Sequence, residues 1–241
     1  MSNNLTDRKF WSDYWKSYRT RKTFSRLHYD NYMCHTKEGG EFIEIGGFPG
    51  EHSLRFFKAR KCKVTLLDFY IDKSIVNALE KVNNVPENTI RCIESDFFAY
   101  KEPDSYDIVF SDGFIEHFED TANVIERHTE LLKSGGTLLF VIPNLRGLNG
   151  WIQKKFDPEN LSIHNLESMR TEKLKEILKS LPLTDCEVTY SGKPMVWLEY
   201  KPGSKIRILK ALIKTFSYAI KLFPIKGKIL SPYIVVYARK I

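Results

Sequence analysis

The sequence predicts an α/β fold in which helices cover both faces of a doubly wound parallel sheet. Three observations support this prediction. Short apolar runs recur along the chain, and several of them end in an acidic residue or a glycine. Segments with apolar residues at helical spacing alternate with these runs. The chain has 241 residues, which is enough for one sheet of seven strands with helices on both faces.

The first predicted strand, residues 41–45, leads into a glycine-rich turn and then a helix. The strand is apolar except for Glu44 near its carboxyl end. Three glycines in the turn would let the backbone approach a ligand closely: Gly46, Gly47 and Gly50. A purely structural strand-to-helix turn would also need glycines, so the turn alone does not decide between these two roles. The spacing does not match G-x-G-x-x-G, which argues against a nicotinamide cofactor.

The second and third predicted strands also end in acidic residues. Asp68 closes the second run, where its carboxylate could accept hydrogen bonds from both hydroxyls of a ribose. Its alternative role is that of a solvated helix cap. The third run, residues 89–98, contains Asp96 and Phe97, which could bind the exocyclic amine and the ring face of an adenine.

The fourth predicted strand, residues 106–113, ends in Ser111, Asp112 and Gly113, and His117 follows it closely. The pattern then continues as alternating helices and strands with one long connection. The remaining predicted elements are a helix at 121–133 ended by Gly135 and Gly136, a strand at 137–142, a loop at 143–164, a helix at 171–181, and strands at 185–190 and 232–239.

In this order, the motifs resemble those of class I S-adenosylmethionine-dependent methyltransferases. The spacing Glu-x-Gly-x-Phe-x-Gly from Glu44 to Gly50 is similar to the first motif of that family, with Phe48 in place of its middle glycine. Asp107 in the fourth strand and His117 after it match residue types that the family commonly has there. The resemblance implies a Rossmann-like sheet of seven strands in the order 3-2-1-4-5-7-6, with the seventh strand antiparallel.

The resemblance also implies the cofactor, S-adenosyl-L-methionine, and the part of it that each segment contacts. The methionine part would lie against the glycine turn, the ribose against the second strand, the adenine against the third, and the sulfonium against the end of the fourth. The residues are, in that order, Glu44, Gly46, Gly47 and Gly50; Asp68; Asp96 and Phe97; and Ser111, Asp112 and Gly113.

The acceptor is predicted to be a small molecule or a glycan that is methylated on oxygen. The fourth strand lacks the Asn/Asp-Pro-Pro-Tyr pattern expected of enzymes that methylate amino groups of bases or glutamine. The chain is broadly similar to bacterial methyltransferases of surface polysaccharide and natural-product pathways. His117 is the first candidate for a general base and His164 the second, although His117 could instead make a structural hydrogen bond. No histidine and carboxylate pair has the spacing of metal ligands, so no metal is predicted, although a site assembled from residues distant in sequence stays open.

Two segments are predicted to shape the acceptor site. Residues 1–37 would form a helical cap, with Tyr14 and Tyr18 on an amphipathic face that either covers the pocket or packs on the sheet edge. A second helix of this cap is expected at 24–34. The connection at 143–164 is long, and loops of that length usually serve function. Its residues for a polar acceptor would be Asn144, Arg146 and Trp151.

The basic charge of the chain is concentrated near its C-terminal end. The net charge is +7, and residues 201–241 hold ten Lys or Arg residues and no Asp or Glu. Within residues 205–228, apolar side chains recur at helical spacing with basic residues between them. The stretch could be the last helix of the fold, with Phe216 buried on the sheet, or a helix that lies on an anionic membrane surface. A phosphate patch for nucleic acid is the least favoured of the three.

The sequence predicts one methyltransferase domain over residues 1–241, with the cofactor-binding core at 38–145 and acceptor-side elements at 146–241. The N-terminus lacks an apolar signal core, and no apolar run is long enough to span a membrane. A cytoplasmic protein is therefore expected, with peripheral membrane contact as the alternative. Four widely spaced cysteines predict neither a zinc site nor a redox pair. A nucleic-acid methyltransferase and a noncatalytic cofactor-binding scaffold subunit stay open as other functions.

Overall fold

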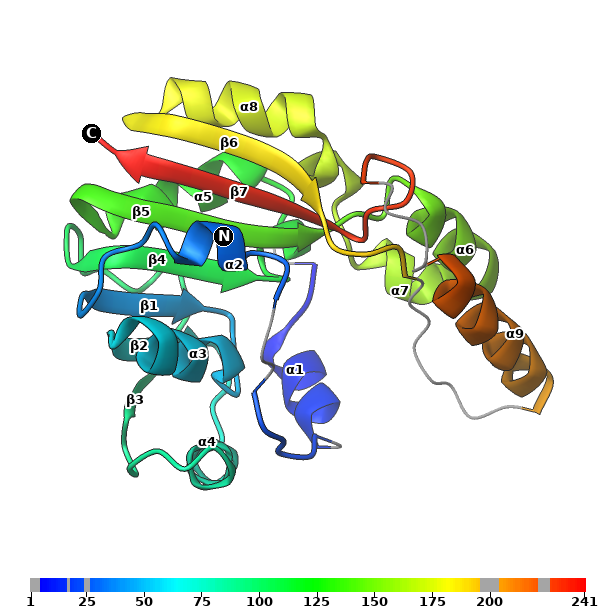
Figure 1. Cartoon of the computed structure of the whole chain (residues 1–241), viewed down its shortest axis with the longest axis horizontal. Coiled ribbons are helices and arrows are strands. Elements are labelled where there is room, and N and C mark those ends of the chain that lie inside the picture. The colour runs from blue at the N-terminus through cyan, green and yellow to red at the C-terminus, as the bar shows by residue number, and fades with distance from the viewer. Residues whose placement is uncertain (1–4, 17, 24–26, 196–203, 221–225) are drawn as a thin grey trace.

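One sheet of seven strands forms the centre of the computed structural model, which describes residues 5–16, 18–23, 27–195, 204–220 and 226–241 (Figure 1). The strand order is β3-β2-β1-β4-β5-β7-β6. Strands β1 to β5 pair in parallel, and β7 is antiparallel to both of its neighbours. The predicted order and the antiparallel seventh strand are confirmed. The strands are β1 (Glu41–Ile45), β2 (Lys63–Asp68), β3 (Ile90–Glu94), β4 (Tyr106–Asp112), β5 (Leu132–Pro143), β6 (Leu183–Ser191) and β7 (Tyr233–Lys240).

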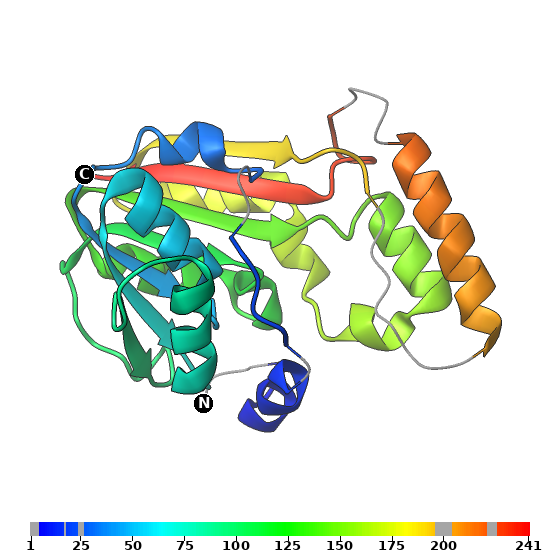
Figure 2. The ribbon, with the colours of Figure 1, turned by 60° about the horizontal axis from the view of Figure 1, so that its bottom comes forward.

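Helices cover both faces of the sheet, and each face has its own apolar core (Figures 1 and 2). Helices α2 (Asp30–Met33), α3 (Glu51–Arg60) and α4 (Lys73–Val82) contribute to one core. Helices α5 (Thr121–Glu130) and α8 (Thr171–Ser180) contribute to the other. Successive residues of β4 alternate between the cores, because side chains along a strand point to opposite faces. The strands that carry the site are therefore held from both sides.

The glycine turn after β1 adopts a shape that larger residues would not allow. Gly46 has a φ of +64°, and a Cβ added there would overlap the ring of Phe114. A Cβ on Gly47 would overlap the side-chain carboxylate of Glu44. The backbone therefore passes close to the end of β4 and over the end of β1, where only glycine fits. This close passage opens space at the carboxyl ends of the central strands.

Strand β5 begins earlier than predicted. It starts at Leu132, which pairs with Tyr106 of β4, and the register shifts before regular pairing resumes at Thr137. Gly135 lies within the strand with a φ of +75°. The two glycines therefore belong to an irregularity inside the strand and do not separate it from the preceding helix, which ends at Glu130.

One predicted helix and one predicted loop also differ from the structure. The expected helix at 24–34 is reduced to α2, and residues 24–26 of that prediction lie outside the described residues. The predicted loop at 143–164 contains two helices, α6 (Leu148–Phe156) and α7 (Pro158–Ser162). The remaining elements are α1 (Arg8–Trp15), the two short 3-10 helices η1 (Ile115–His117) and η2 (Leu166–Met169), and α9 (Ser204–Ile220).

Helix α9 lies beside α6, beyond the carboxyl ends of β4 and β5, in both views (Figures 1 and 2). It does not cover the sheet as a crossover helix would, and Phe216 is 53% exposed instead of buried. Ser217 and Ile220 form the buried side of its described part. The prediction that Phe216 is a core residue is therefore wrong. Across the described residues, no helix combines the length and the apolar character needed to cross a bilayer.

Candidate functional site

Two adjoining cavities lie at the carboxyl ends of the central strands. The inner cavity is bounded by the ends of β1, β2 and β4, by the segment after β3, and by α1. The outer cleft, of about 800 Å³, lies between α1, the glycine turn and the segment around α7. Residues that line both spaces mark their junction: Trp11, Trp15, Gly46, Gly113 and His117. This is the edge at which ligands bind in open α/β sheets.

Asp68 lies at the inner cavity with its carboxylate oriented by the backbone. Its Oδ2 accepts a hydrogen bond from the Phe48 amide at 2.9 Å, and its Oδ1 accepts one from the Tyr70 amide at 3.1 Å. Burial raises the pKa of Asp68 to about 6, although these backbone hydrogen bonds partly offset the effect. The position agrees with the predicted ribose contact, and a carboxylate keeps lone pairs for two hydroxyls after accepting both amides.

Asp96 and Phe97 line the same cavity one strand further along the sheet. The Asp96 carboxylate accepts a hydrogen bond from the Phe98 amide at 2.7 Å, which orients its side chain. Phe97 is largely buried, and its ring contacts that of Phe114 edge to face at 5.4 Å. An acidic acceptor beside a fixed aromatic ring is the arrangement predicted for adenine.

Glu44 and Gly50 are predicted ligands that line neither cavity. Glu44 is fully buried beneath the turn, where its Oε2 accepts hydrogen bonds from the Ser53 amide and hydroxyl at 2.7 and 2.5 Å. Burial raises the pKa of Glu44 to about 8. Gly50 precedes α3 with a φ of +98° and faces Ile90. The structure therefore places these two residues as supports of the turn, whereas Gly46 and Gly47 line the space above it.

Phe48, which replaces the middle glycine of the family's first motif, does not fill the inner cavity. Its ring is buried and contacts Trp15 of α1 edge to face at 5.2 Å, and Tyr70 at 5.7 Å. Its side chain borders the outer cleft, while its amide reaches Asp68. The phenylalanine therefore connects the glycine turn to α1.

The end of β4 distributes its three predicted ligands between different environments. Ser111 is buried behind the cavities, with its hydroxyl 3.2 Å from Nε2 of His128 on α5. Asp112 lines the outer cleft and lies 3.4 Å from Nε2 of both His28 and His52. Burial would raise the pKa of Asp112, but these two histidines outweigh burial and lower it. Only Gly113 borders both cavities, so Ser111 supports the site from beneath.

Helix α1 brings aromatic side chains over the site. Tyr14 of α1 and Tyr18, which follows the helix, line the outer cleft, and the Tyr18 hydroxyl donates to Oε1 of Glu51 at 2.7 Å. Trp11 and Trp15 reach further and border both cavities. The sequence analysis assigned Tyr14 and Tyr18 to the acceptor site but not these two tryptophans. Their spacing of four residues was the available signal.

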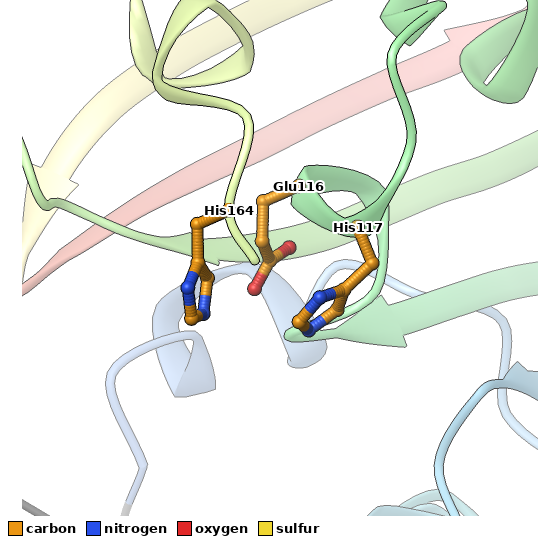
Figure 3. Close-up of side chains that lie close together, drawn as sticks. All are labelled: Glu116, His117 and His164. Carbon is orange, nitrogen blue, oxygen red and sulfur yellow. The ribbon is translucent and has the colours of Figure 1, made fainter. Parts of the chain in front are cut away.

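His117 and His164, the two predicted catalytic residues, come together across the outer cleft. Their ring centroids are 4.9 Å apart, and Trp11 contacts His117 edge to face at 5.3 Å. Burial and the neighbouring His164 lower the pKa of His117 to about 4, and burial also lowers the pKa of His164. Glu116 lies beside both rings (Figure 3), and burial raises its pKa to about 8. The sequence analysis missed Glu116.

Asn144, Arg146 and Trp151, the predicted acceptor ligands, line neither cavity. The Asn144 amide donates to the carbonyl oxygens of Lys228 and Ser231, both at 2.8 Å, so it joins two chain segments. Arg146 pairs with Glu167, and Trp151 is 61% exposed on α6. The prediction depended on a loop at 143–164. Because that segment forms α6 and α7, these side chains point elsewhere and the assignment is corrected.

Comparisons with known proteins give the family and the fold. A protein-family model described as a methyltransferase domain matches residues 15–185. None of the curated proteins matches the sequence. A solved structure of phosphoethanolamine N-methyltransferase 2 from Haemonchus contortus, with phosphomonomethylethanolamine and S-adenosylhomocysteine, has 19% identity and a TM-score of 0.58. That match covers 87% of this chain and 52% of the other, so the chain spans about half the length of that protein.

Two further structures have the same fold over most of their length. An S-adenosylmethionine-dependent methyltransferase from Archaeoglobus fulgidus has 18% identity and a TM-score of 0.56, covering 88% of this chain and 91% of the other. A geranyl diphosphate C-methyltransferase from Streptomyces coelicolor, solved with Mg²⁺, geranyl diphosphate and S-adenosylhomocysteine, has 9% identity and a TM-score of 0.58. That match covers 88% of this chain and 78% of the other.

Proposed function

The chain belongs to the methyltransferase-domain family of class I S-adenosylmethionine-dependent enzymes, and we propose that it methylates a hydroxyl group of a small-molecule or glycan acceptor. Its cofactor is S-adenosyl-L-methionine. In this proposal the inner cavity holds the adenosyl group, and the outer cleft holds the acceptor. The methyl group passes between them where the two spaces adjoin, beside Gly113 and His117.

One observation carries the proposal: the predicted ribose and adenine residues border the inner cavity, the predicted catalytic residue His164 borders the adjoining outer cleft, and His117 lies where the two spaces meet. Asp68, Asp96 and Phe97 line the inner cavity alone, whereas His164 lines only the outer cleft. Methyl transfer is an in-line displacement, so the donor and the acceptor must approach the methyl carbon from opposite sides. Two adjoining cavities with a shared boundary meet that requirement.

The outer cleft also offers groups for an acceptor hydroxyl. The Nδ1 atoms of His117 and His164 lie 3.1 and 2.7 Å from backbone carbonyl oxygens, which can only accept hydrogen bonds. Each ring therefore carries its proton on Nδ1 and keeps a lone pair on Nε2. Such a lone pair can accept a hydrogen bond from an acceptor hydroxyl and take its proton, which supports transfer to oxygen.

A binding measurement with a matched control tests the cofactor assignment. Asp68→Asn should weaken binding of S-adenosylhomocysteine, measured by calorimetry, by about 1–3 kcal/mol, because the ribose hydroxyls lose a charged acceptor. Asp104→Asn changes an exposed carboxylate outside the site and should bind as the parent does. Equal affinities for the parent and Asp68→Asn, with both folded, would remove the ribose assignment.

The acceptor is tested with a labelled methyl group. The protein is incubated with cofactor carrying an isotopic label on its methyl group and with fractionated extract of its own cell, and the labelled product is analysed for the methylated atom. The proposal expects a methyl ether or ester on a small molecule or glycan. A label on nitrogen or carbon would overturn the oxygen assignment and leave methyl transfer itself intact.

We further propose that α9 makes peripheral contact with an anionic membrane surface. Leu212 and Phe216 lie one turn apart on α9, so they share a face, and they are 63% and 53% exposed. The chain segment 201–241 is strongly basic. Exposed apolar side chains on a basic helix suit the interface of a membrane that contains anionic lipid. Such contact would suit an acceptor carried on a lipid.

A further inference from the structure

Three side chains from two distant segments converge beside the outer cleft (Figure 3). Glu116 and His117 belong to η1, directly after β4, and His164 follows α7. One potential ligand atom from each lies within 4.8 Å of the other two. We propose that Glu116, His117 and His164 bind a divalent first-row transition-metal ion that holds the acceptor oxygen. That the ion holds the acceptor oxygen rests on the proposed function, whereas the metal site itself does not.

The two imidazoles are oriented as metal ligands are. His117 donates through Nδ1 to the Ile163 carbonyl oxygen, and His164 donates through Nδ1 to the Asn160 carbonyl oxygen. In metal-binding histidines the non-ligating ring nitrogen commonly donates to a backbone carbonyl or a carboxylate, which sets the tautomer and the ring orientation. Both rings thus present an unprotonated Nε2, the form that a metal ion needs.

Glu116 lacks the partner that a buried carboxylate needs. It is 1% exposed, and its Oε2 has no hydrogen-bond partner. Among the residues that the structure describes, no Lys or Arg pairs with it. Burying an unpaired carboxylate is costly, whereas a bound dication would compensate its charge directly. This observation points to a ligand independently of the two histidines.

The scaffold of the cluster joins its two segments. The Asn165 amide donates to the Glu116 carbonyl oxygen at 2.7 Å, and the Asn165 side chain donates to the carbonyl oxygens of Phe118 and Glu119 at 2.8 and 3.0 Å. The bond from His117 to Ile163 connects the same segments. The cluster is therefore held by hydrogen bonds on both sides before any ligand arrives, as a binding site requires.

The donor set indicates the kind of metal. Two imidazoles and one carboxylate suit Zn²⁺, Fe²⁺ or Mn²⁺, whereas Mg²⁺ and Ca²⁺ prefer oxygen ligands throughout. Bonds of about 2.1 Å would place the donors about 3.0–3.5 Å apart, so small side-chain rotations would complete the site. Three protein ligands leave further positions open for the acceptor, which is the pattern of catalytic and not of structural sites.

The location connects the cluster to methyl transfer. A Cβ added to Gly113 would lie 3.7 Å from Oε1 of Glu116, and Gly113 borders both cavities. With the ion bound, both histidines use their Nε2 lone pairs as ligands, so the ion would replace them as the group that activates the acceptor hydroxyl, and the hydroxyl would release its proton to water in the open cleft. The resulting oxygen would use a lone pair to form the new bond to the methyl carbon. The carbon–sulfur bond would break with its electron pair moving to sulfur, which leaves neutral S-adenosylhomocysteine.

The test measures metal binding directly. The full chain is stripped with a chelator, and calorimetry follows the addition of Zn²⁺, Mn²⁺ or Co²⁺, with the visible absorption of bound Co²⁺ reporting on its coordination. We expect one ion per chain. Glu116→Gln, which keeps the side-chain shape, and His164→Asn, at a half-buried position, should each weaken binding at least about ten-fold. His35→Asn changes an exposed histidine elsewhere and should bind as the parent does.

Each outcome decides between the site and its alternatives. Binding of no transition metal by the stripped parent, or unchanged binding by both cluster variants, overturns the proposal. If His35→Asn weakens metal binding as much as the cluster variants do, the ion binds to surface histidines instead. Saturation with Mg²⁺ alone would contradict the donor argument. S-adenosylhomocysteine binding is measured on the same samples. If the parent binds S-adenosylhomocysteine but no metal ion, only the metal site is removed. If the parent does not bind S-adenosylhomocysteine, the proposed function is removed instead.

Discussion

At the scale of single residues, Asp68 is expected to make cofactor binding depend on pH. Burial raises its pKa to about 6, above the ordinary value of 3.8, so it is ionised at neutral pH and gains a proton as the pH falls through about 6. The protonated form accepts hydrogen bonds less well, so the affinity for S-adenosylhomocysteine should fall between pH 7 and pH 5. Calorimetry across this range should give a flatter profile for Asp68→Asn, and parallel profiles for the two proteins would contradict the assignment.

Phe48 provides a second prediction at this scale. Phe48→Gly restores the glycine of the family's first motif but removes a buried ring that contacts Trp15 and Tyr70. We expect a loss of about 3–5 kcal/mol in the free energy of unfolding, as for other large-to-small changes of buried aromatic residues. Denaturant titration measures it, with Phe48→Leu as the milder control. A variant as stable as the parent, with tighter cofactor binding, would mean that the glycine is the better residue here.

The acidic residues of the inner cavity could be predicted because each one follows an apolar run that forms a strand. Asp68 and Asp96 depend only on that local rule. The cluster of Glu116, His117 and His164 could not be predicted in the same way. Its two segments, one with Glu116 and His117 and the other with His164, are more than forty residues apart, and the hydrogen bonds of Asn165 that join them depend on tertiary structure. Glu44 is acidic and well placed in sequence, yet burial beneath the turn makes it a support.

At the scale of elements, α9 is expected to carry the membrane contact. Leu212→Gln together with Phe216→Gln should reduce sedimentation with vesicles containing anionic lipid, because the exposed apolar side chains of the helix are lost. Added salt should release the parent protein, since charge contributes to the contact. Ala211→Gln, at an exposed position that carries no large apolar group, is the matched control. No sedimentation of the parent at low salt would exclude the contact.

The same helix corrects an expectation about stability. A buried Phe216 would cost several kcal/mol on truncation, but more than half of this side chain is exposed. Phe216→Ala should therefore change the free energy of unfolding by no more than about 0.5 kcal/mol, as for surface substitutions. Denaturant titration distinguishes the two cases, and a loss of about 3 kcal/mol or more would restore the core assignment.

Element boundaries were predictable where glycine marks a turn and unpredictable where it serves packing. The turn after β1 was found from its glycines. Gly150 was instead taken for part of a loop, although it lies within α6, where a Cβ would overlap the Leu145 carbonyl oxygen. Glycine is expected to weaken a helix, so its presence concealed α6. Gly135 and Gly136 concealed the start of β5 for a similar reason.

At the scale of the whole molecule, Asp107 is expected to contribute to stability in a defined pH range. Its carboxylate accepts from Lys37, from Lys133 and from the Glu41 amide, so it joins the N-terminal part of the chain to β4 and β5. Burial alone would raise its pKa, but these donors outweigh burial and hold the pKa at about 2. Because the folded pKa lies below the ordinary value of 3.8, the stabilisation is present above about pH 4 and is lost as the pH falls through about 2.

Asp107→Asn measures this contribution. The variant should lose about 1–2 kcal/mol of unfolding free energy at neutral pH, and its difference from the parent should shrink as the pH falls towards 2. Asp104→Asn, an exposed carboxylate three residues earlier, should show little difference at any pH. A difference between parent and Asp107→Asn that does not change with pH would mean that the charge is not responsible.

The order of the sheet was predictable because the motifs resemble those of the methyltransferase family, and the resemblance implies a strand order that the structure confirms. The positions of α6, α7 and α9 were not, because they lie beyond the sheet and depend on contacts between the segments around 145 and 229. The Leu148 amide, for example, donates to the Ile229 carbonyl oxygen at 2.9 Å. No periodicity in the sequence encodes a contact between segments so far apart.

The position of α1 has a consequence for turnover. Trp11 and Trp15 border both cavities, and the inner one holds only about 70 Å³, against roughly 300–1,000 Å³ for most ligand pockets. We therefore expect an adenosyl group to enter while α1 is withdrawn, and the acceptor cleft to be complete after α1 returns. We expect a compulsory order, with the cofactor first to bind and its demethylated product last to leave. In steady-state kinetics that product should compete with the cofactor and not with the acceptor.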